Sequence, residues 1–258
     1  MTFPIDLHIH GVVIPSHLIF DWLSLAIAYK YYEVSKNTNT DSLSTGNRWT
    51  ILISAAVGGF FGAHLLAVFE QPTLVLHQSW LYYFADKTII GFLAGAIIAV
   101  EIVKKIIHET KSSGDLFTYP IILGIIVGRI GCFLTGITDD TVGLPTHLPW
   151  AINQGDGIPR HPTSLYEIIF LLVLWWVLRR IQKHSILQSG TLFRLFIFSY
   201  FSLRFFIEFV KPIQPVFIGL STIQIVCAAI ALYYLVEIIF LIKNKKINIL
   251  LWTPKNQI

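Results

Sequence analysis

Residues 128–136 read GRIGCFLTG, and residues 159–167 read PRHPTSLYE. The first stretch places Arg129 inside an apolar run, and the second brings Arg160 and His161 directly before a predicted helix start. An ionised side chain inside a bilayer costs about 2.5–3.5 kcal/mol on insertion scales, so such residues are candidates for function. We interpret the apolar segments on both sides as a scaffold around these cations.

The composition excludes an ordinary soluble domain. Of the 258 residues, 54% are hydrophobic and only 13% are charged, and the charges fall between long apolar runs. Seven of these runs are each long enough to cross about 30 Å of hydrocarbon. They cover residues 16–34, 49–69, 87–107, 116–136, 164–181, 191–210 and 217–242. We expect an all-α polytopic membrane protein with seven transmembrane helices, in which residues 1–258 form a single integral membrane domain.

The positions of lysine and arginine predict the orientation in the membrane. Fourteen of the 19 flank connectors on one side, and only Lys87, Arg160 and Lys211 lie on the other. Cytoplasmic loops are enriched in these residues, so we expect a bacterial inner-membrane protein with its N-terminus outside and its C-terminus in the cytoplasm. Residues 137–163 then face outward, and their four prolines and three glycines predict an ordered, turn-rich loop. No basic stretch is dense enough to bind nucleic acid.

A second arginine lies deep in an apolar run. Tyr200, Arg204 and Glu208 are spaced i, i+4, i+8 and therefore share one face of a helix. An ion pair between Arg204 and Glu208 with a purely structural role is one interpretation of this spacing. Arg129 has no acidic residue three or four positions away in its own helix. Its anion must come from Glu208, from Glu167 or from a lipid phosphate.

The predicted helix after the loop has a start that favours anions. Pro162 opens it, and Ser164 with Glu167 has the spacing of a capping box. The positive end of the helix dipole, with Arg160 and His161 before it, attracts an anionic headgroup. The alternative is an ordinary helix start whose cations touch bulk lipid. Together with the two buried arginines, the pattern indicates a phosphate site at the edge of the hydrocarbon.

Small residues and cysteines also lie near the first arginine. Gly128 and Gly131 would let a neighbouring helix approach closely. The two cysteines of the chain, Cys132 and Cys227, do not have metal-ligand spacing, and we expect neither a metal nor a cofactor. An isolated cysteine in an apolar span is more often a packing residue than a nucleophile, and we interpret Cys132 in this way.

The chain resembles the prolipoprotein diacylglyceryl transferase family in five motifs, which are GRIGCFLTG, LPWAI (148–152), PRHPTSLYE, YFSLRFFIEF (200–209) and GLSTIQ (219–224). The N-terminal half resembles the family mainly in hydropathy and in GGFFGAHL and GFLAG. The resemblance implies a membrane enzyme that transfers a diacylglyceryl group from phosphatidylglycerol. The acceptor is the cysteine thiol in the signal-peptide motif of a lipoprotein precursor, and glycerol 1-phosphate leaves.

The resemblance also implies roles for individual residues. It assigns catalysis to Arg129, Arg204, Tyr200 and His161. It assigns substrate binding to Arg129, Arg160, Tyr166, Glu167, Glu208 and Gln224. Two arginines in a low-dielectric site would stabilise the charge that develops on a leaving phosphate, and a tyrosine would hold the lipid or pass a proton.

The chain departs from the family pattern at four places. The family usually has His-Gly-Gly-Leu where residues 90–93 here read IGFL, and that histidine is the family's candidate base for the thiol. Its signature asparagine is Cys132 here, a glutamate is Ile137, and a second-span arginine is His64. His161 and His64 are the substitute bases that the sequence offers. A phospholipid-using transferase with another acceptor, and a non-catalytic membrane lipid-binding or transport protein, are therefore kept as alternatives.

Overall fold

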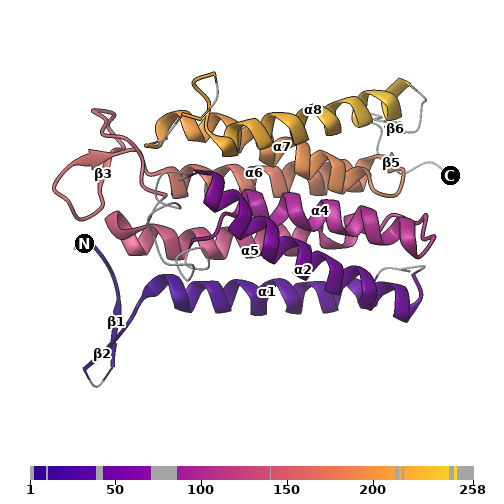
Figure 1. The fold of residues 1–258 in the computed structure, drawn as a ribbon, viewed down its shortest axis with the longest axis horizontal. Helices are drawn as coiled ribbons and strands as arrows, with labels where there is room; N and C mark the ends of the chain where they lie inside the picture. Colours follow the sequence, from indigo (N-terminus) through magenta and orange to yellow (C-terminus); the bar gives the residue numbers. More distant parts are fainter. Residues whose placement is uncertain are drawn as a thin grey trace.

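The computed structural model describes residues 3–9, 11–38, 43–70, 86–139, 141–212, 215–216, 218–243 and 247–248. Within these ranges lie seven α-helices, which are α1 (Ser16–Thr38), α2 (Thr45–Glu70), α4 (Ile89–Ile106), α5 (Gly114–Thr135), α6 (Thr163–His184), α7 (Thr191–Ile207) and α8 (Thr222–Lys243). Each helix falls on one of the seven predicted apolar runs. The helices lie side by side along the long axis of the molecule (Figure 1).

Short elements occupy the two ends of the bundle. They are the strands β1 (Leu7–Ile9), β2 (Val12–Ile14), β3 (Ile152–Asn153), β4 (Pro159–Arg160), β5 (Ile186–Leu187) and β6 (Ile247–Asn248), with the 3-10 turns η2 (Gly136–Thr138) and η3 (Glu208–Val210). The antiparallel pairs β1–β2 and β3–β4 lie at the same end of the bundle, whereas β5 lies at the other end (Figure 1). The predicted turn-rich loop is built around β3–β4, where Gly155 and Gly157 adopt positive φ angles of 122° and 80°.

The core lies where α5, α6 and α7 meet. Ile122, Leu171, Phe196, Ile197 and Phe201 are completely buried there. In a bilayer the lipid tails are as apolar as these side chains, so the stabilisation comes from close packing rather than from removal of apolar surface from water. This packed centre fixes the three helices that carry the charged residues described below.

The outer faces of several helices are apolar. Exposed side chains recur every four residues along α2 (Ile53, Val57, Phe61, Leu65, Phe69) and along α8 (Leu232, Val236, Phe240). Such stripes are expected where a helix faces lipid. Among the described residues, three helices are long and apolar enough to cross a membrane, with mean hydropathies of 2.0, 2.0 and 2.6: Thr45–Glu70, Gly114–Thr138 and Thr222–Lys243. The protein is thus a mostly helical bundle with membrane-spanning character.

Two helix starts are capped by carboxylates from other helices. Asp115, at the start of α5, accepts hydrogen bonds from the backbone N–H groups of Gly190 (2.6 Å) and Phe193 (2.9 Å) at the start of α7. Glu70, at the end of α2, accepts one from Ile223 N at the start of α8 (2.7 Å). A negative group near a helix N-terminus satisfies free N–H groups and complements the dipole. These acidic residues tie the ends of the bundle together.

The helices α2 and α4 cross at glycines. A Cβ added to Gly62 would lie 2.3 Å from the carbonyl oxygen of Gly91, and one added to Gly95 would lie 2.2 Å from that of Gly58. Any side chain here would push the backbones apart, because real Cβ atoms do not approach so closely. Membrane helices commonly pack through small residues in this way.

The prediction that glycines beside Arg129 admit a neighbouring helix is right for one of the two. A Cβ on Gly131 would lie 2.6 Å from Cβ of Phe20 on α1. At Gly128 the prediction is wrong, since a Cβ there would meet no described atom within 4 Å. The two glycines point in different directions around α5, and only Gly131 faces α1.

We predict that Gly95→Val lowers the midpoint of thermal unfolding in detergent, because the added methyl groups would overlap the α2 backbone. Overpacking of this kind costs about 1–3 kcal/mol. The matched control is Gly128→Val, where the space is open. Equal midpoints for the two variants would contradict the close crossing of α2 and α4.

Candidate functional site

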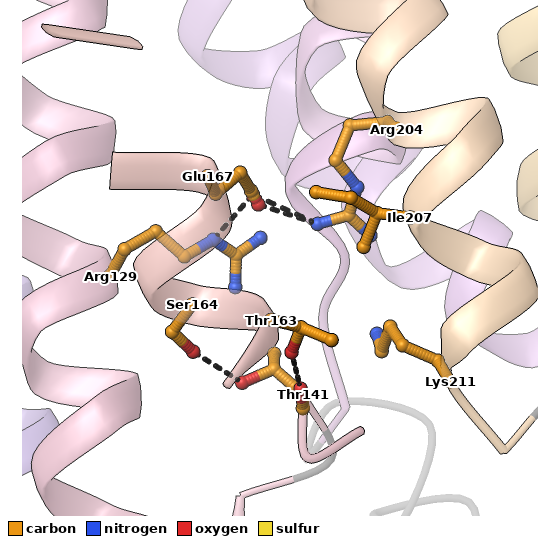
Figure 2. A pocket seen from close by; sticks show the side chains of 8 residues that line it. All are labelled: Arg129, Thr141, Thr163, Ser164, Glu167, Arg204, Ile207 and Lys211. Atoms are coloured by element: carbon orange, nitrogen blue, oxygen red, sulfur yellow. Dashed lines mark hydrogen bonds and ion pairs between the residues drawn. The ribbon is translucent and has the colours of Figure 1, made fainter. Parts of the chain in front are cut away.

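A buried carboxylate joins two arginines from different helices (Figure 2). Arg129 on α5 donates from Nε to Oε1 of Glu167 on α6 at 2.7 Å. Arg204 on α7 donates from Nη1 to both oxygens of Glu167, at 3.1 and 3.0 Å. Of the two protein carboxylates that the sequence leaves open for Arg129, Glu167 is the one that it contacts.

The α7 end of the cluster contains a second carboxylate. Arg204 donates from Nη2 to Glu208 Oε1 at 2.5 Å, which confirms the predicted pair within one helix. Lys211 Nζ lies 3.7 Å from the same oxygen. Tyr200 donates its hydroxyl to Glu167 Oε1 at 3.2 Å. The predicted common face of residues 200, 204 and 208 therefore points into the arginine cluster, which we define as Arg129, Glu167, Arg204, Glu208 and Lys211.

The cluster is almost completely removed from the surface of the protein. The side chains of Arg204, Glu167 and Glu208 are 5%, 2% and 2% exposed. Burying ions costs several kcal/mol each unless close partners and hydrogen bonds compensate them. The compensation is incomplete, because Nε of Arg204 is buried without a hydrogen-bond partner among the residues that the structure describes.

A small pocket adjoins the cluster at the start of α6. Its lining combines cations, hydroxyl groups and one carboxylate: Arg129, Thr141, Thr163, Ser164, Glu167, Arg204, Ile207 and Lys211. Three cations thus face one carboxylate in the lining, and Glu208 lies behind Arg204. The guanidinium of Arg129 and the ammonium of Lys211 approach the hydroxyl groups from opposite sides (Figure 2). Positive charge therefore predominates in the lining of this pocket.

Hydrogen bonds fix the hydroxyl side of the pocket. Thr163 donates from Oγ1 to the backbone oxygen of Thr141, and the hydroxyls of Thr141 and Ser164 lie 3.2 Å apart. The side chains leave no room in this pocket even for a water molecule. The site is therefore closed around its charges in this conformation.

Comparison with known proteins identifies the family of this chain. The family model described as prolipoprotein diacylglyceryl transferase matches residues 1–241. The chain belongs to this family. Among similar proteins, the phosphatidylglycerol–prolipoprotein diacylglyceryl transferase of Finegoldia magna is 30% identical over 257 residues, covering 95% of this chain and 94% of its own.

Two further relatives carry the same name. The protein of Glaesserella parasuis is 29% identical over 218 residues, covering 82% of this chain and 78% of its own. That of Bordetella parapertussis is 28% identical over 186 residues, covering 67% and 68%. The family resemblance that the sequence motifs indicate is thereby confirmed.

The structure places some family residues outside the arginine cluster. His161 lies with Nδ1 3.1 Å from the Tyr166 hydroxyl, which also accepts a hydrogen bond from Trp150 Nε1 at 2.8 Å. Arg160 donates to Asp156 at 2.8 and 2.5 Å, and this contact holds the pKa of the Asp156 carboxyl below its ordinary value. These residues form the outer rim of the loop, and the structure does not bring them into contact with the buried arginines.

Gln224 and His64 have backbone partners. Gln224 accepts from Ser221 N at 2.9 Å and its own N–H donates to the Ser221 hydroxyl at 3.1 Å, which caps α8. His64 Nδ1 lies 2.8 Å from the backbone oxygen of Asp86. These contacts hold the two side chains in the fold. The role of Gln224 in substrate binding and that of His64 as a base stay predictions.

The predicted capping box at the start of α6 is wrong. Pro162 is the N-cap residue and makes no side-chain cap, and the helix begins at Thr163. The reason is that both partners of the box have other contacts: Ser164 bonds to Thr141, and Glu167 bonds to two guanidinium groups. Charge-assisted bonds of this kind are roughly twice as strong as neutral ones.

Sequence reasoning missed Lys211 and Thr141 as lining residues. Lys211 was counted with the outward cations, although its position three residues after Glu208 is a local pairing signal. Thr141 carries no such signal, because it reaches the pocket only through the folding of the loop.

We predict that Glu167→Gln lowers the free energy of unfolding in detergent by about 3–5 kcal/mol, because it leaves two buried guanidinium groups without their shared carboxylate. Asp156→Asn removes an exposed carboxylate from an arginine and is the control, with no measurable change expected. Chemical denaturation followed by tryptophan fluorescence measures both. A stability loss no larger than that of the control would contradict a bridging role for Glu167.

Proposed function

We propose that the protein transfers a diacylglyceryl group from phosphatidylglycerol to the signal-motif cysteine thiol of lipoprotein precursors. Family membership supports the reaction type. The structural observation that carries the proposal is the pocket in which Arg129, Arg204 and Lys211 face a single lining carboxylate, Glu167. Such a pocket matches a substrate whose phosphate departs with increased negative charge.

The chemistry of the pocket follows from that charge. The acceptor sulfur attacks the glyceryl carbon that bears the phosphoester oxygen, a C–S bond forms, and the C–O bond breaks. The electron pair stays on the oxygen of the leaving glycerol 1-phosphate. Buried guanidinium groups stabilise this developing charge more strongly than water would, because the local dielectric constant is low.

Glu167 holds the place of the phosphate when lipid is absent. It accepts from both arginines and from Tyr200, so the cations are paired in the lipid-free state. No water-sized space remains beside these contacts, so a lipid headgroup does not fit in this conformation. Phosphate binding therefore replaces some of the Glu167 hydrogen bonds and requires the loop over the start of α6 to open.

The seven helices are the transmembrane spans of a bacterial inner-membrane protein. Three of them qualify by length and hydropathy, and the lipid-facing stripes on α2 and α8 agree. The distribution of lysine and arginine supports an outside N-terminus, a cytoplasmic C-terminus and an outward-facing loop at 137–163. Phosphatidylglycerol then reaches the pocket from the bilayer, and the precursor's signal peptide reaches it from the same membrane.

We predict that Arg129→Ala and Arg204→Ala each lower turnover at least about 100-fold, since removal of one donor to a developing oxyanion costs about 10²–10³ in rate. Purified protein in phosphatidylglycerol vesicles is given a precursor peptide, and lipidated peptide and glycerol phosphate are measured by mass spectrometry. Arg194→Ala is the matched control, because Arg194 lies on the same helix as Arg204 but pairs with Glu237 outside the pocket.

Two results would redirect the proposal. Glycerol phosphate release with an acceptor other than the cysteine peptide would favour a related transferase. Saturable lipid binding without turnover of any acceptor would favour a non-catalytic lipid-binding protein. Full activity of both arginine variants would remove the pocket from the reaction.

A further inference from the structure

A second polar cluster lies directly beside Arg129. It comprises His17 at the start of α1, Cys132 near the end of α5 and Asp139 just after η2. One ligand atom from each of the three side chains lies within 4.8 Å of the other two. The close packing of α1 on Gly131 brings them together, since a Cβ on that glycine would lie 3.5 Å from Cα of His17.

The separation of two of these groups matches that of two ligands on one cation. His17 Nε2 lies 3.5 Å from Asp139 Oδ2, longer than the roughly 2.7–3.2 Å of N–H···O hydrogen bonds. Ligand atoms around one tetrahedral Zn²⁺ lie about 3.3–3.6 Å apart, given metal–ligand bonds of about 2.0–2.3 Å. Imidazole, thiolate and carboxylate are also the donor types that zinc prefers.

The surroundings orient these side chains as ligands. His17 Nδ1 lies 3.2 Å from Asp21 Oδ2, and the same oxygen is 2.7 Å from Lys87 Nζ. A carboxylate on one imidazole nitrogen directs the other nitrogen toward a metal. On the opposite side, Arg129 donates from Nη1 to Cys132 Sγ at 3.5 Å, which fixes the direction of the sulfur.

We propose that His17, Cys132 and Asp139 bind one divalent cation of the zinc class, and that its fourth ligand is the acceptor thiol. The neutral imidazole, thiolate and carboxylate balance the two charges of the cation, so the loaded site carries no net charge. Three protein ligands leave one position open, as in catalytic zinc sites. His17 is 32% exposed, which gives the acceptor a route to that position.

The second half of this inference rests on the proposed transferase function. Among the described residues that line the arginine pocket there is no histidine, and its carboxylate is held by two arginines. The acceptor thiol still requires activation, because the thiolate is the nucleophile. A cation that binds the sulfur displaces its proton to water at the outward face. The thiolate then attacks the glyceryl carbon while the phosphate leaves toward the arginines.

Cobalt(II) titration of the purified, chelator-treated protein tests the site without reference to turnover. We expect one Co²⁺ per chain, with tetrahedral visible bands and a near-ultraviolet sulfur-to-cobalt charge-transfer band. Cys132→Ser should lose the charge-transfer band, whereas Cys227→Ser, which changes the other buried cysteine, should keep it. Asp21→Asn should weaken cobalt binding about 10–100-fold through the orienting contact, and this variant leaves all three ligands in place.

Defined results overturn each half of the inference. Absence of saturable cobalt binding, or the same spectrum for Cys132→Ser and the parent protein, would show a histidine paired only with carboxylates. Visible bands that shift with a cysteine acceptor peptide but not with its serine analogue support the thiol ligand, and unchanged bands exclude it. Full turnover by metal-free protein would leave the transferase function intact and remove the metal from it. Cobalt binding without turnover would leave the metal site intact and remove the transferase function.

Discussion

One carboxylate, Glu167, accepts hydrogen bonds from two guanidinium groups that belong to two other helices. This shared ion pair links α5, α6 and α7. Its geometry requires Phe196, Ile197 and Phe201 to hold α7 in register, and all three are completely buried. Packing and charge therefore depend on each other at the centre of the fold.

A single carboxylate between two arginines cannot neutralise both. Glu208 compensates part of the charge of Arg204, but Lys211 adds another cation next to it. The lining of the pocket thus holds three cations against one carboxylate, and buried ions cost stability unless they are compensated. A purely structural cluster would be expected to balance its charges, since unpaired buried ions are strongly destabilising. The imbalance at the pocket is the physical argument for an anionic substrate.

Hydropathy and local spacing predict the helices and the residues that share a helix face. They do not predict which residues of different helices contact one another. The seven helices follow from the length of the apolar runs, and the Tyr200, Arg204 and Glu208 face follows from a four-residue period. The partner of Arg129 was left open among three anions, because a contact between residues 129 and 167 depends on how two helices dock. The capping-box prediction is wrong for the same reason. The local spacing is that of a capping box, but in the fold Glu167 bonds to arginines of two other helices.

The spacing of residues in the sequence does not predict the cluster of His17, Cys132 and Asp139. Its first member is separated from the others by more than one hundred positions, and the cysteines alone predicted no metal. Only the approach of α1 to α5 at Gly131 reveals it. A residue pattern can show metal ligands when one element carries several of them, and here His17 lies far in the sequence from Cys132 and Asp139.

Arg129 connects the two sites. Its Nε donates to Glu167 and its Nη1 donates to Cys132. One guanidinium therefore contacts the pocket on one side and the cluster of His17, Cys132 and Asp139 on the other. A phosphate that displaces Glu167 would draw the guanidinium toward the pocket and weaken its contact with the sulfur. Because a guanidinium is planar and rigid, movement at one edge changes the other edge as well. Donor binding at the pocket would therefore change the charge environment of the acceptor side, which provides a physical route for coupling the arrival of the lipid to activation of the thiol.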